Sequence, residues 1–218
     1  YLANRLTPMT SQTKVAGVIL AGGRAQRMNF ENKALMRYQG QPLIAYSFSA
    51  MRPLVDELLI NTHTDDPLYH VWGVGVIADA TVDFSGPLAG ILAAMNAIDA
   101  DTLIVAPCDA PFITTEQLNR LLLEHKIYQS DITVACCGEQ IHSVFMVVNT
   151  ALKTSLEHYL AKGERKVRRW FVEHQTHYVD FGDDVRGFEN INTLGELHAI
   201  ASPLHETPII ECHRLNRP

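Results

Sequence analysis

Two adjacent glycines, Gly22 and Gly23, follow a short apolar run at residues 14–20, and two cations, Arg27 and Lys33, come shortly after them. Because glycine has no Cβ, the backbone N–H groups of such a loop can approach phosphate oxygens closely. The segment has neither the P-loop spacing nor the dinucleotide-binding glycine pattern. It meets the same physical need, so we expect the glycines to hold phosphates and the two cations to offset their charge. A plain turn with solvated cations is the alternative.

Three further polar side chains, Asn61, Asp79 and Asp109, each follow an apolar run that predicts a strand. Asp109 lies between two prolines, and a carboxylate fixed in this way suits Mg²⁺, which usually takes one or two carboxylates together with substrate phosphates. The alternative for Asp109 is an ordinary turn or a helix N-cap. Asp79 could accept hydrogen bonds from a base or a ribose hydroxyl, although Asp83 is equally available by residue type.

A second group of candidates lies in the later part of the chain. Asn190 and Asn192 are two residues apart and would share one face of a strand, unless Asn192 is only a helix N-cap. The basic cluster that begins at Arg165 (RKVRR) could receive a large anionic substrate or form a solvated helical face. His142 lies between two predicted strands and is the most interesting of the ten histidines; most of the others are expected at the surface.

The elements that must position these residues alternate along the chain. Apolar runs predict strands at 14–20, 57–61, 74–78, 102–106, 131–136, 143–148 and 176–181, and helical spacing predicts helices at 42–51, 86–98, after Thr114, at 150–160, at 164–173 and after 193. This order predicts an α/β fold: a single three-layer, Rossmann-like domain with a mostly parallel central sheet. Parallel sheets bind ligands beyond the carboxyl ends of their strands, where the candidate residues stand.

Composition narrows the classes of function. The chain has 218 residues, 47% of them hydrophobic, and a net charge of −6. It is too apolar for general disorder, and its acidic balance provides no global field for nucleic acid or anionic lipid. No apolar run is long enough to span a membrane, and the N-terminus lacks the apolar segment of a signal peptide. Any phosphate chemistry must therefore depend on a local positive site.

The four cysteines and the two ends of the chain complete the prediction. The cysteines have neither zinc-site spacing nor the pattern of a disulfide framework, which indicates reduced thiols and a cytoplasmic protein. We expect one domain at 14–201, an N-terminal tail at 1–13 and a C-terminal tail or linker at 202–218. Because the chain starts at Tyr1, we hypothesise a segment of a longer precursor or fusion. A G-x-S-x-G motif and kinase motifs are absent, so phosphoryl or nucleotidyl transfer is favoured.

Several motifs together resemble the molybdenum cofactor guanylyltransferase family between about residues 15 and 200. They are LAGGRAQRM (20–28), Lys33 followed by Ala-Leu, GQPL (40–43), Asn61, Asp79, GPLAG (86–90), PCDAPF (107–112) and NINTLGEL (190–197). The glycine loop and the lysine occur in many nucleotidyltransferases, whereas the later motifs are more specific. Asn29 and Asn32 stand where the family commonly has Gly and Asp, and Ser143 where Pro often follows the histidine.

The resemblance implies a nucleotidyltransferase fold and an enzyme that uses GTP and Mg²⁺ to transfer GMP to the terminal phosphate of molybdopterin, releasing pyrophosphate. It implies these roles: Leu20, Ala21, Gly22 and Gly23 in nucleotide binding; Lys33 at the phosphates; Asn61 and Asp79 at the guanosine; Asp109 at Mg²⁺; and Asn190, Asn192 and Arg165 on the pterin side. Lys33, Arg27 and Asp109 would be the catalytic set. Transient contact with proteins that deliver or insert the cofactor is also implied.

Other functions stay open at this point. A cytidylyltransferase acting on the same pterin, or a sugar- or polyol-phosphate nucleotidyltransferase, would use the same fold and a similar glycine loop. A non-catalytic nucleotide-binding or carrier module would also fit the residues, but it would release no pyrophosphate.

Overall fold

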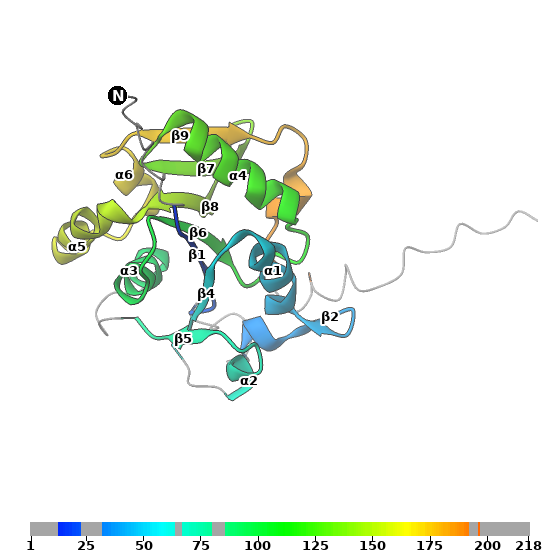
Figure 1. Cartoon of the computed structure of the whole chain (residues 1–218). Coiled ribbons are helices and arrows are strands. Elements are labelled where there is room, and N and C mark those ends of the chain that lie inside the picture. The colour runs from blue at the N-terminus through cyan, green and yellow to red at the C-terminus, as the bar shows by residue number, and fades with distance from the viewer. Residues whose placement is uncertain (1–12, 23–31, 64–66, 80–85, 192–195, 197–218) are drawn as a thin grey trace, which may run out of the picture.

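The computed structural model describes residues 13–22, 32–63, 67–79, 86–191 and 196, and the structural statements below concern those residues. A seven-stranded sheet has the order β5–β4–β1–β6–β8–β7–β9 (Figure 1). Its strands are β1 (Val15–Leu20), β4 (Glu57–Asn61), β5 (Gly75–Ile77), β6 (Thr102–Pro107), β7 (Ile132–Cys137), β8 (Gln140–Asn149) and β9 (Thr176–Asp180). Neighbouring strands are parallel except where β8 pairs with β6 and β7. The predicted mostly parallel α/β sheet is confirmed.

Helices cover both faces of this sheet and complete three layers. α1 (Leu43–Met51) and α4 (Thr115–Tyr128) pack on one face, and α3 (Pro87–Ala97), α5 (Lys153–Ala161) and α6 (Val167–Phe171) pack on the other (Figure 1). The shorter elements are a hairpin of β2 (Arg37–Tyr38) and β3 (Gln41–Pro42), the helix α2 (Pro67–His70), and the 3₁₀ turns η1 (Lys33–Leu35), η2 (Arg52–Leu54), η3 (Thr150–Leu152) and η4 (Val185–Phe188).

Strand β1 shows why the central strands are apolar along their whole length. Its alternate side chains enter two different cores: Ile19 packs toward α1 and α4, and Val18 packs toward α3 and α5. A Cβ at Gly17 would lie 2.4 Å from Sδ of Met51 in α1. The missing side chain therefore lets α1 pack closely on β1, which helps to set the position of the loop that follows the strand.

The second half of the chain departs from the predicted element boundaries. β8 starts three residues before the predicted strand, and a bulge lies opposite it between Val134 and Ala135 of β7. The helix predicted at 150–160 begins as η3, and the side chain of Asn149 caps this turn by accepting a hydrogen bond from the N–H of Ala151 at 2.9 Å. The helix predicted at 164–173 is shorter and is confined to α6.

Short local elements were absent from the sequence-based prediction. The β2–β3 hairpin turns through Gln39 and Gly40, which have φ of 47° and 81°. Glycine tolerates a positive φ, but glutamine rarely adopts one, so the residue types did not indicate a turn here. The predicted start of α4 is confirmed: Thr114 and Gln117 form a capping box, with bonds of 3.0 and 3.2 Å between their side chains and backbone N–H groups.

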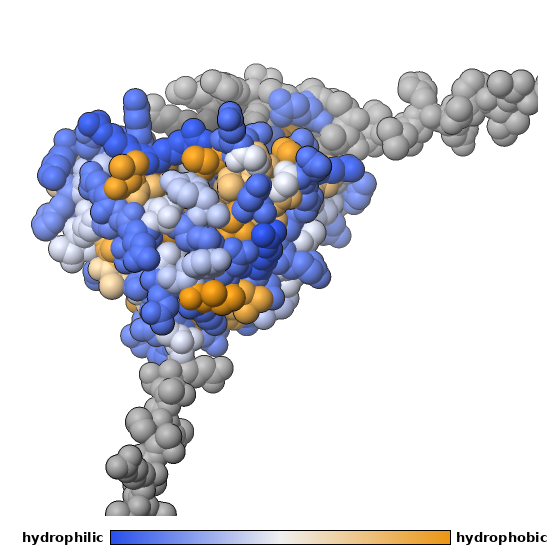
Figure 2. All heavy atoms as spheres, turned by 90° about the horizontal axis from the view of Figure 1, so that it is seen from above, coloured by the Kyte–Doolittle hydropathy of each residue, from blue (hydrophilic) through white to orange (hydrophobic). Residues whose placement is uncertain are grey.

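The surface and the chain ends add little to these boundaries. Hydrophilic residues dominate the face drawn in Figure 2, where hydrophobic residues form small groups. Within the described ranges, no helix is both long enough and apolar enough to cross a membrane. The predicted tails at 1–13 and 202–218, Thr13 aside, lie outside the described residues, as does most of the helix expected after residue 193.

His125 is an exception among the histidines other than His142, most of which are expected at the surface, because it is only 6% exposed on α4. Its Nδ1 lies 3.0 Å from Oγ1 of Thr133, whose hydroxyl also lies 2.7 Å from Oγ of Ser130. Burial lowers the pKa of His125, and the nearby Asp131 only partly opposes this effect. The unfolded chain therefore binds a proton at this residue more readily than the folded chain does.

We expect this histidine to make the fold acid-sensitive. As pH falls through about 6.5, the unfolded state takes up a proton that the folded state resists, so stability present above that pH is lost by up to about 1.4 kcal/mol per pH unit. Urea unfolding of wild type and His125→Asn at pH 7.5 and 5.5 measures the effect. The variant should lose less stability on acidification. His158→Asn, at an exposed position of α5, is the control; an equal loss in wild type and His125→Asn would contradict the prediction.

Candidate active site

The carboxyl ends of four neighbouring strands meet at one edge of the sheet. Leu20 at the end of β1 is in register with Asn61 of β4 and with Pro107 of β6. Asn61 is in turn in register with Ile77 of β5, two residues before Asp79. Parallel pairing thus brings together residues that are far apart in sequence, as the strand order predicts. We call this edge, from Asp79 to Asp109, the carboxyl edge.

Lys33 and Asp109 form an ion pair at this edge, between Nζ of the lysine and Oδ2 of the aspartate. Their side chains are 21% and 12% exposed, so the pair is largely shielded from water. Lys33 begins η1, and the residue before it, Asn32, accepts a hydrogen bond from the hydroxyl of Tyr69 at 2.8 Å. The buried Tyr69 therefore helps to place the lysine, a role that no sequence motif indicated.

Two backbone bonds fix the loop that carries Asp109. The N–H of Cys108 donates to the carbonyl of Leu20 at 3.0 Å, and the N–H of Ile191 donates to the carbonyl of Asp109 at 2.9 Å. One bond ties the loop to β1, and the other ties it to the segment of the predicted pterin-side residues. Burial raises the pKa of the Cys108 thiol, which favours its protonated form.

Oδ1 of Asp109 makes this residue a suitable ligand for Mg²⁺. Oδ1 is buried and has no hydrogen-bond partner in the part of the chain that the structure describes. A buried carboxylate oxygen without a partner is costly, and a bound cation would remove that cost. Within the same residues, no three side chains of His, Cys, Asp or Glu gather into a metal cluster. One carboxylate is enough where substrate phosphates and water supply the remaining ligands of Mg²⁺.

A second polar group lies at the ends of β4 and β5. Nδ2 of Asn61 donates to Oδ1 of Asp79 at 2.9 Å, and it also lies 3.5 Å from the carbonyl of Ile77. The other side of the amide faces Gly90 in α3, where a Cβ would lie 2.3 Å from Oδ1 of Asn61. Gly90 is therefore part of the site, because its missing side chain leaves room for the Asn61 amide. The GPLAG motif signalled the helix start, and the structure shows what the final glycine accommodates.

His63 joins this polar group, although the sequence did not single it out. Its Nε2 lies 3.5 Å from Oδ2 of Asp79. A Cβ on Gly22 would lie 3.0 Å from the same Nε2, so the imidazole stands against Gly22. The available signal was its place two residues after Asn61, just beyond the end of a strand. Of the other predicted loop residues, Gly23 and Arg27 lie outside the described residues.

The predicted pterin-side residues are less closely grouped. Asn190 lies in an irregular segment beside Ile191 and not in a strand, and Asn192 lies outside the described residues, so the shared face of the two amides stays a prediction. Arg165 turns back on its own chain, where Nη1 donates to the carbonyls of Leu160 and Glu164 at 2.9 and 2.7 Å. These bonds close the turn between α5 and α6. Arg165 therefore has a structural role in this turn, and its role on the pterin side stays a prediction.

His142 and Arg168 meet near the start of β8. Nη2 of Arg168 donates to the carbonyl of Ile141 at 3.3 Å. His142 is 8% exposed, and the centroid of its ring lies 5.1 Å from the centroid of the Phe188 ring. Burial lowers the pKa of His142, and the charge of Arg168 lowers it further. The imidazole is therefore neutral near pH 7, so the cationic character of this corner comes from Arg168.

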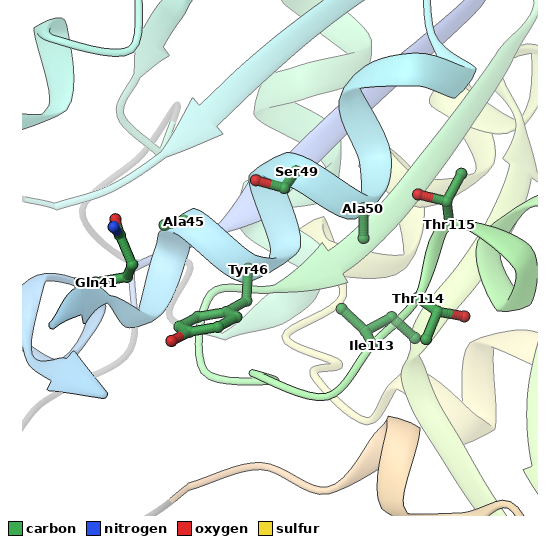
Figure 3. A pocket seen from close by; sticks show the side chains of 8 residues that line it. All are labelled: Gln41, Ala45, Tyr46, Ser49, Ala50, Ile113, Thr114 and Thr115. Atoms are coloured by element: carbon green, nitrogen blue, oxygen red, sulfur yellow. The ribbon is translucent and has the colours of Figure 1, made fainter. Parts of the chain in front are cut away.

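Two pockets lie beside the carboxyl edge. Figure 3 shows the first, of about 340 Å³, between α1 and the start of α4, with Tyr46 on one side and Ile113 and Thr114 on the other. The second, of about 460 Å³, shares Tyr46 and Thr114 and is also lined by Phe112 and Arg186. Neither is lined by the Lys33–Asp109 pair. We place the candidate site at the pair, because the convergent charges and strand ends are there.

A three-layer α/β sheet with a glycine, a lysine and two largely buried carboxylates at its carboxyl edge is typical of a nucleotidyltransferase fold. A family model described as the MobA-like NTP transferase domain matches residues 17–178. The chain belongs to this family.

Individual relatives agree with this family. The molybdenum cofactor guanylyltransferase of Shewanella baltica (strain OS155) is 38% identical over 193 residues, which is 88% of this chain and 97% of that protein. The protein of the same name from Shewanella amazonensis is 35% identical over 191 residues, again 88% and 97%. The resemblance drawn from the motifs is confirmed.

Solved structures show how widely the fold is shared. Molybdopterin-guanine dinucleotide biosynthesis protein A from Archaeoglobus fulgidus superposes with a TM-score of 0.72 at 21% identity, covering 86% of this chain and 96% of that one. The 4-diphosphocytidyl-2C-methyl-D-erythritol synthase from Anaerococcus prevotii gives 0.68 at 12% identity, covering 86% and 94%. At these identities the likeness concerns the fold alone, so the choice of substrate must be argued from the site.

Proposed function

We propose that this protein is a molybdenum cofactor guanylyltransferase, which transfers GMP from GTP to the terminal phosphate of molybdopterin. The observation that carries the proposal is the Lys33–Asp109 pair, which stands at the carboxyl edge with the second carboxylate oxygen buried and without a partner among the described residues. The full-length similarity to guanylyltransferases supports the choice of nucleotide and acceptor. GTP and molybdopterin are then the substrates.

The two substrates are both anions, so the site must offset their repulsion. In the proposed reaction, an oxygen of the acceptor phosphate forms a bond to the α-phosphorus of GTP while the bond to pyrophosphate breaks. Lys33 would move from Asp109 to the phosphates, and Arg27 would add a second positive charge. Gly22 and Gly23, with Leu20 and Ala21, would line the nucleotide. Preorganised charges of this kind stabilise the transition state without forming a covalent enzyme intermediate.

Asp109 is the residue that would hold Mg²⁺, through the oxygen that lacks a partner among the described residues. Bound Mg²⁺ would neutralise phosphate charge and orient the triphosphate. Asn61 and Asp79 would contact the guanosine on the other side of β1. Asn190, Asn192 and Arg165 are proposed for the pterin side, and transient contacts with proteins that deliver or insert the cofactor would occur there.

A pyrophosphate-release assay tests this function directly. The protein is incubated with GTP, CTP or ATP in Mg²⁺ buffer, each with and without molybdopterin. We expect pyrophosphate only with GTP and molybdopterin together, and none after chelation of the metal. Release with CTP and the pterin would instead indicate a cytidylyltransferase. No release with any nucleotide, in a preparation that binds GTP, would indicate a carrier or binding module.

A further inference from the structure

His63 occupies a position at the carboxyl edge that the proposed chemistry has not used. It follows β4, and its side chain is 42% exposed, whereas the side chain of Asp79 beside it is only 6% exposed. The imidazole Nε2 lies 3.5 Å from Oδ2 of Asp79. A Cβ on Gly22 would lie 3.0 Å from this Nε2, so the glycine leaves the space that the ring occupies. The ring therefore stands between the solvent, Gly22 and a buried carboxylate.

The two oxygens of Asp79 have different neighbours. Oδ1 accepts a hydrogen bond from Nδ2 of Asn61 at 2.9 Å, and Oδ2 faces His63. A carboxylate in so dry a place needs donors on both oxygens, since burial of an uncompensated charge is expensive. Asn61 cannot turn freely, because its amide oxygen is packed against Gly90. Oδ1 of Asp79 is thus held by the fixed amide of Asn61, and the position of Oδ2 depends on the His63 imidazole.

Guanine offers two adjacent donors, the N1–H and the 2-amino group, and each carboxylate oxygen has more than one lone pair with which to accept them. Recognition of both donors requires the carboxylate plane to be fixed. We propose that His63 is a positioning residue that orients Asp79 to recognise the 2-amino-6-oxo edge of guanine. This inference rests on the proposed use of GTP, and it assigns base specificity to a residue pair held from β4 and β5.

The experiment compares nucleotides that differ by one donor. Dissociation constants of GTP and of ITP, which lacks the 2-amino group, are measured by calorimetry with the full chain in Mg²⁺ and without pterin, so that no turnover occurs. His63→Ala removes the ring. His63→Gln places an amide nitrogen near the former Nε2 and is the conservative variant. His158→Ala removes an exposed histidine from α5 and serves as the matched control.

We expect wild type to bind GTP more tightly than ITP. His63→Ala should weaken GTP binding by about tenfold while changing ITP binding much less, because a recognition bond, and not the fold, is lost. His63→Gln should restore most of the preference, and the thermal midpoints should agree. In a double-mutant cycle with Asp79→Asn, the effects on the GTP:ITP ratio should be strongly non-additive.

The outcomes separate this inference from the function on which it rests. A GTP:ITP ratio unchanged in His63→Ala would overturn the inference, and so would additive effects in the cycle. Failure of His63→Gln to restore the preference would also overturn it, because the donor position would then be irrelevant. Wild type that binds no GTP at all would instead overturn the proposed function.

Discussion

Replacing Asp109 by alanine is expected to reduce pyrophosphate release by about 10³-fold or more while leaving the fold intact. The carboxylate is the proposed metal handle, and loss of the charge stabilisation that it organises removes several kcal/mol of transition-state stabilisation. The fold should survive because the structural bond of this residue, from Ile191 N–H, is accepted by its backbone carbonyl. The side chain of Lys33 is 21% exposed, so water can reach its ammonium group when the Asp109 carboxylate is removed.

Steady-state pyrophosphate release with GTP and molybdopterin measures this effect, and circular dichroism with thermal unfolding checks the fold. Asp183→Ala, which removes an exposed carboxylate between β9 and η4, is the matched control and should retain wild-type turnover. Asp109→Asn keeps the shape and removes the charge, so it should be nearly as inactive as the alanine variant. Near-normal turnover in either Asp109 variant would refute the assignment.

Gly90→Ala should be the second most damaging substitution, although alanine favours helices by about 1 kcal/mol over glycine. The new Cβ would lie 2.3 Å from Oδ1 of Asn61 and 2.9 Å from Cδ2 of Leu20. Asn61 is 3% exposed, and its amide is tied to Asp79, so the collision cannot be relieved without breaking that bond. We expect a stability loss of about 1–3 kcal/mol from overpacking and GTP binding weakened by at least about tenfold.

Urea unfolding and GTP calorimetry measure the two effects. Asn96→Ala, at an exposed position on the same helix, should change neither quantity. The variant that combines Gly90→Ala with Asn61→Ala should recover part of the lost stability, because the colliding amide is removed and the two changes couple through direct contact. Gly90→Ala with wild-type stability and affinity would show that Asn61 can move aside at little cost.

The architecture could be predicted from the sequence, because strands that are buried on both faces consist mainly of apolar residues. β4 was predicted with both boundaries correct, and the run at 14–20 matched β1 to within one residue, since β1 and the middle of β4 are buried and apolar. The capping box at Thr114 could also be predicted, because it depends on two side chains that are three residues apart in the sequence. The β2–β3 hairpin was missed, since its positive φ at Gln39 has no sequence signature.

The candidate site, too, could be predicted from the sequence only in part. Lys33, Asn61, Asp79 and Asp109 could be named from the sequence because each follows a predicted strand or glycine loop, and the structure brings them to one edge. The irregular segment at Asn190 could not be located from the sequence, because the bond from the N–H of Ile191 to the Asp109 carbonyl ties it to the site. Such a contact joins residues that are far apart in the chain and depends on the finished fold.

By itself, the sequence determined the class of this protein: a mostly parallel α/β sheet, a local positive site in an acidic chain, and residues suited to phosphate and Mg²⁺. Only the tertiary structure decided the arrangement within the site. It paired Lys33 with Asp109, set Gly90 against the Asn61 amide, and placed His63 beside Asp79. The physical reason is that residue type and local spacing encode burial and periodicity, whereas contacts between strand ends depend on strand order and on the space that packed neighbours leave.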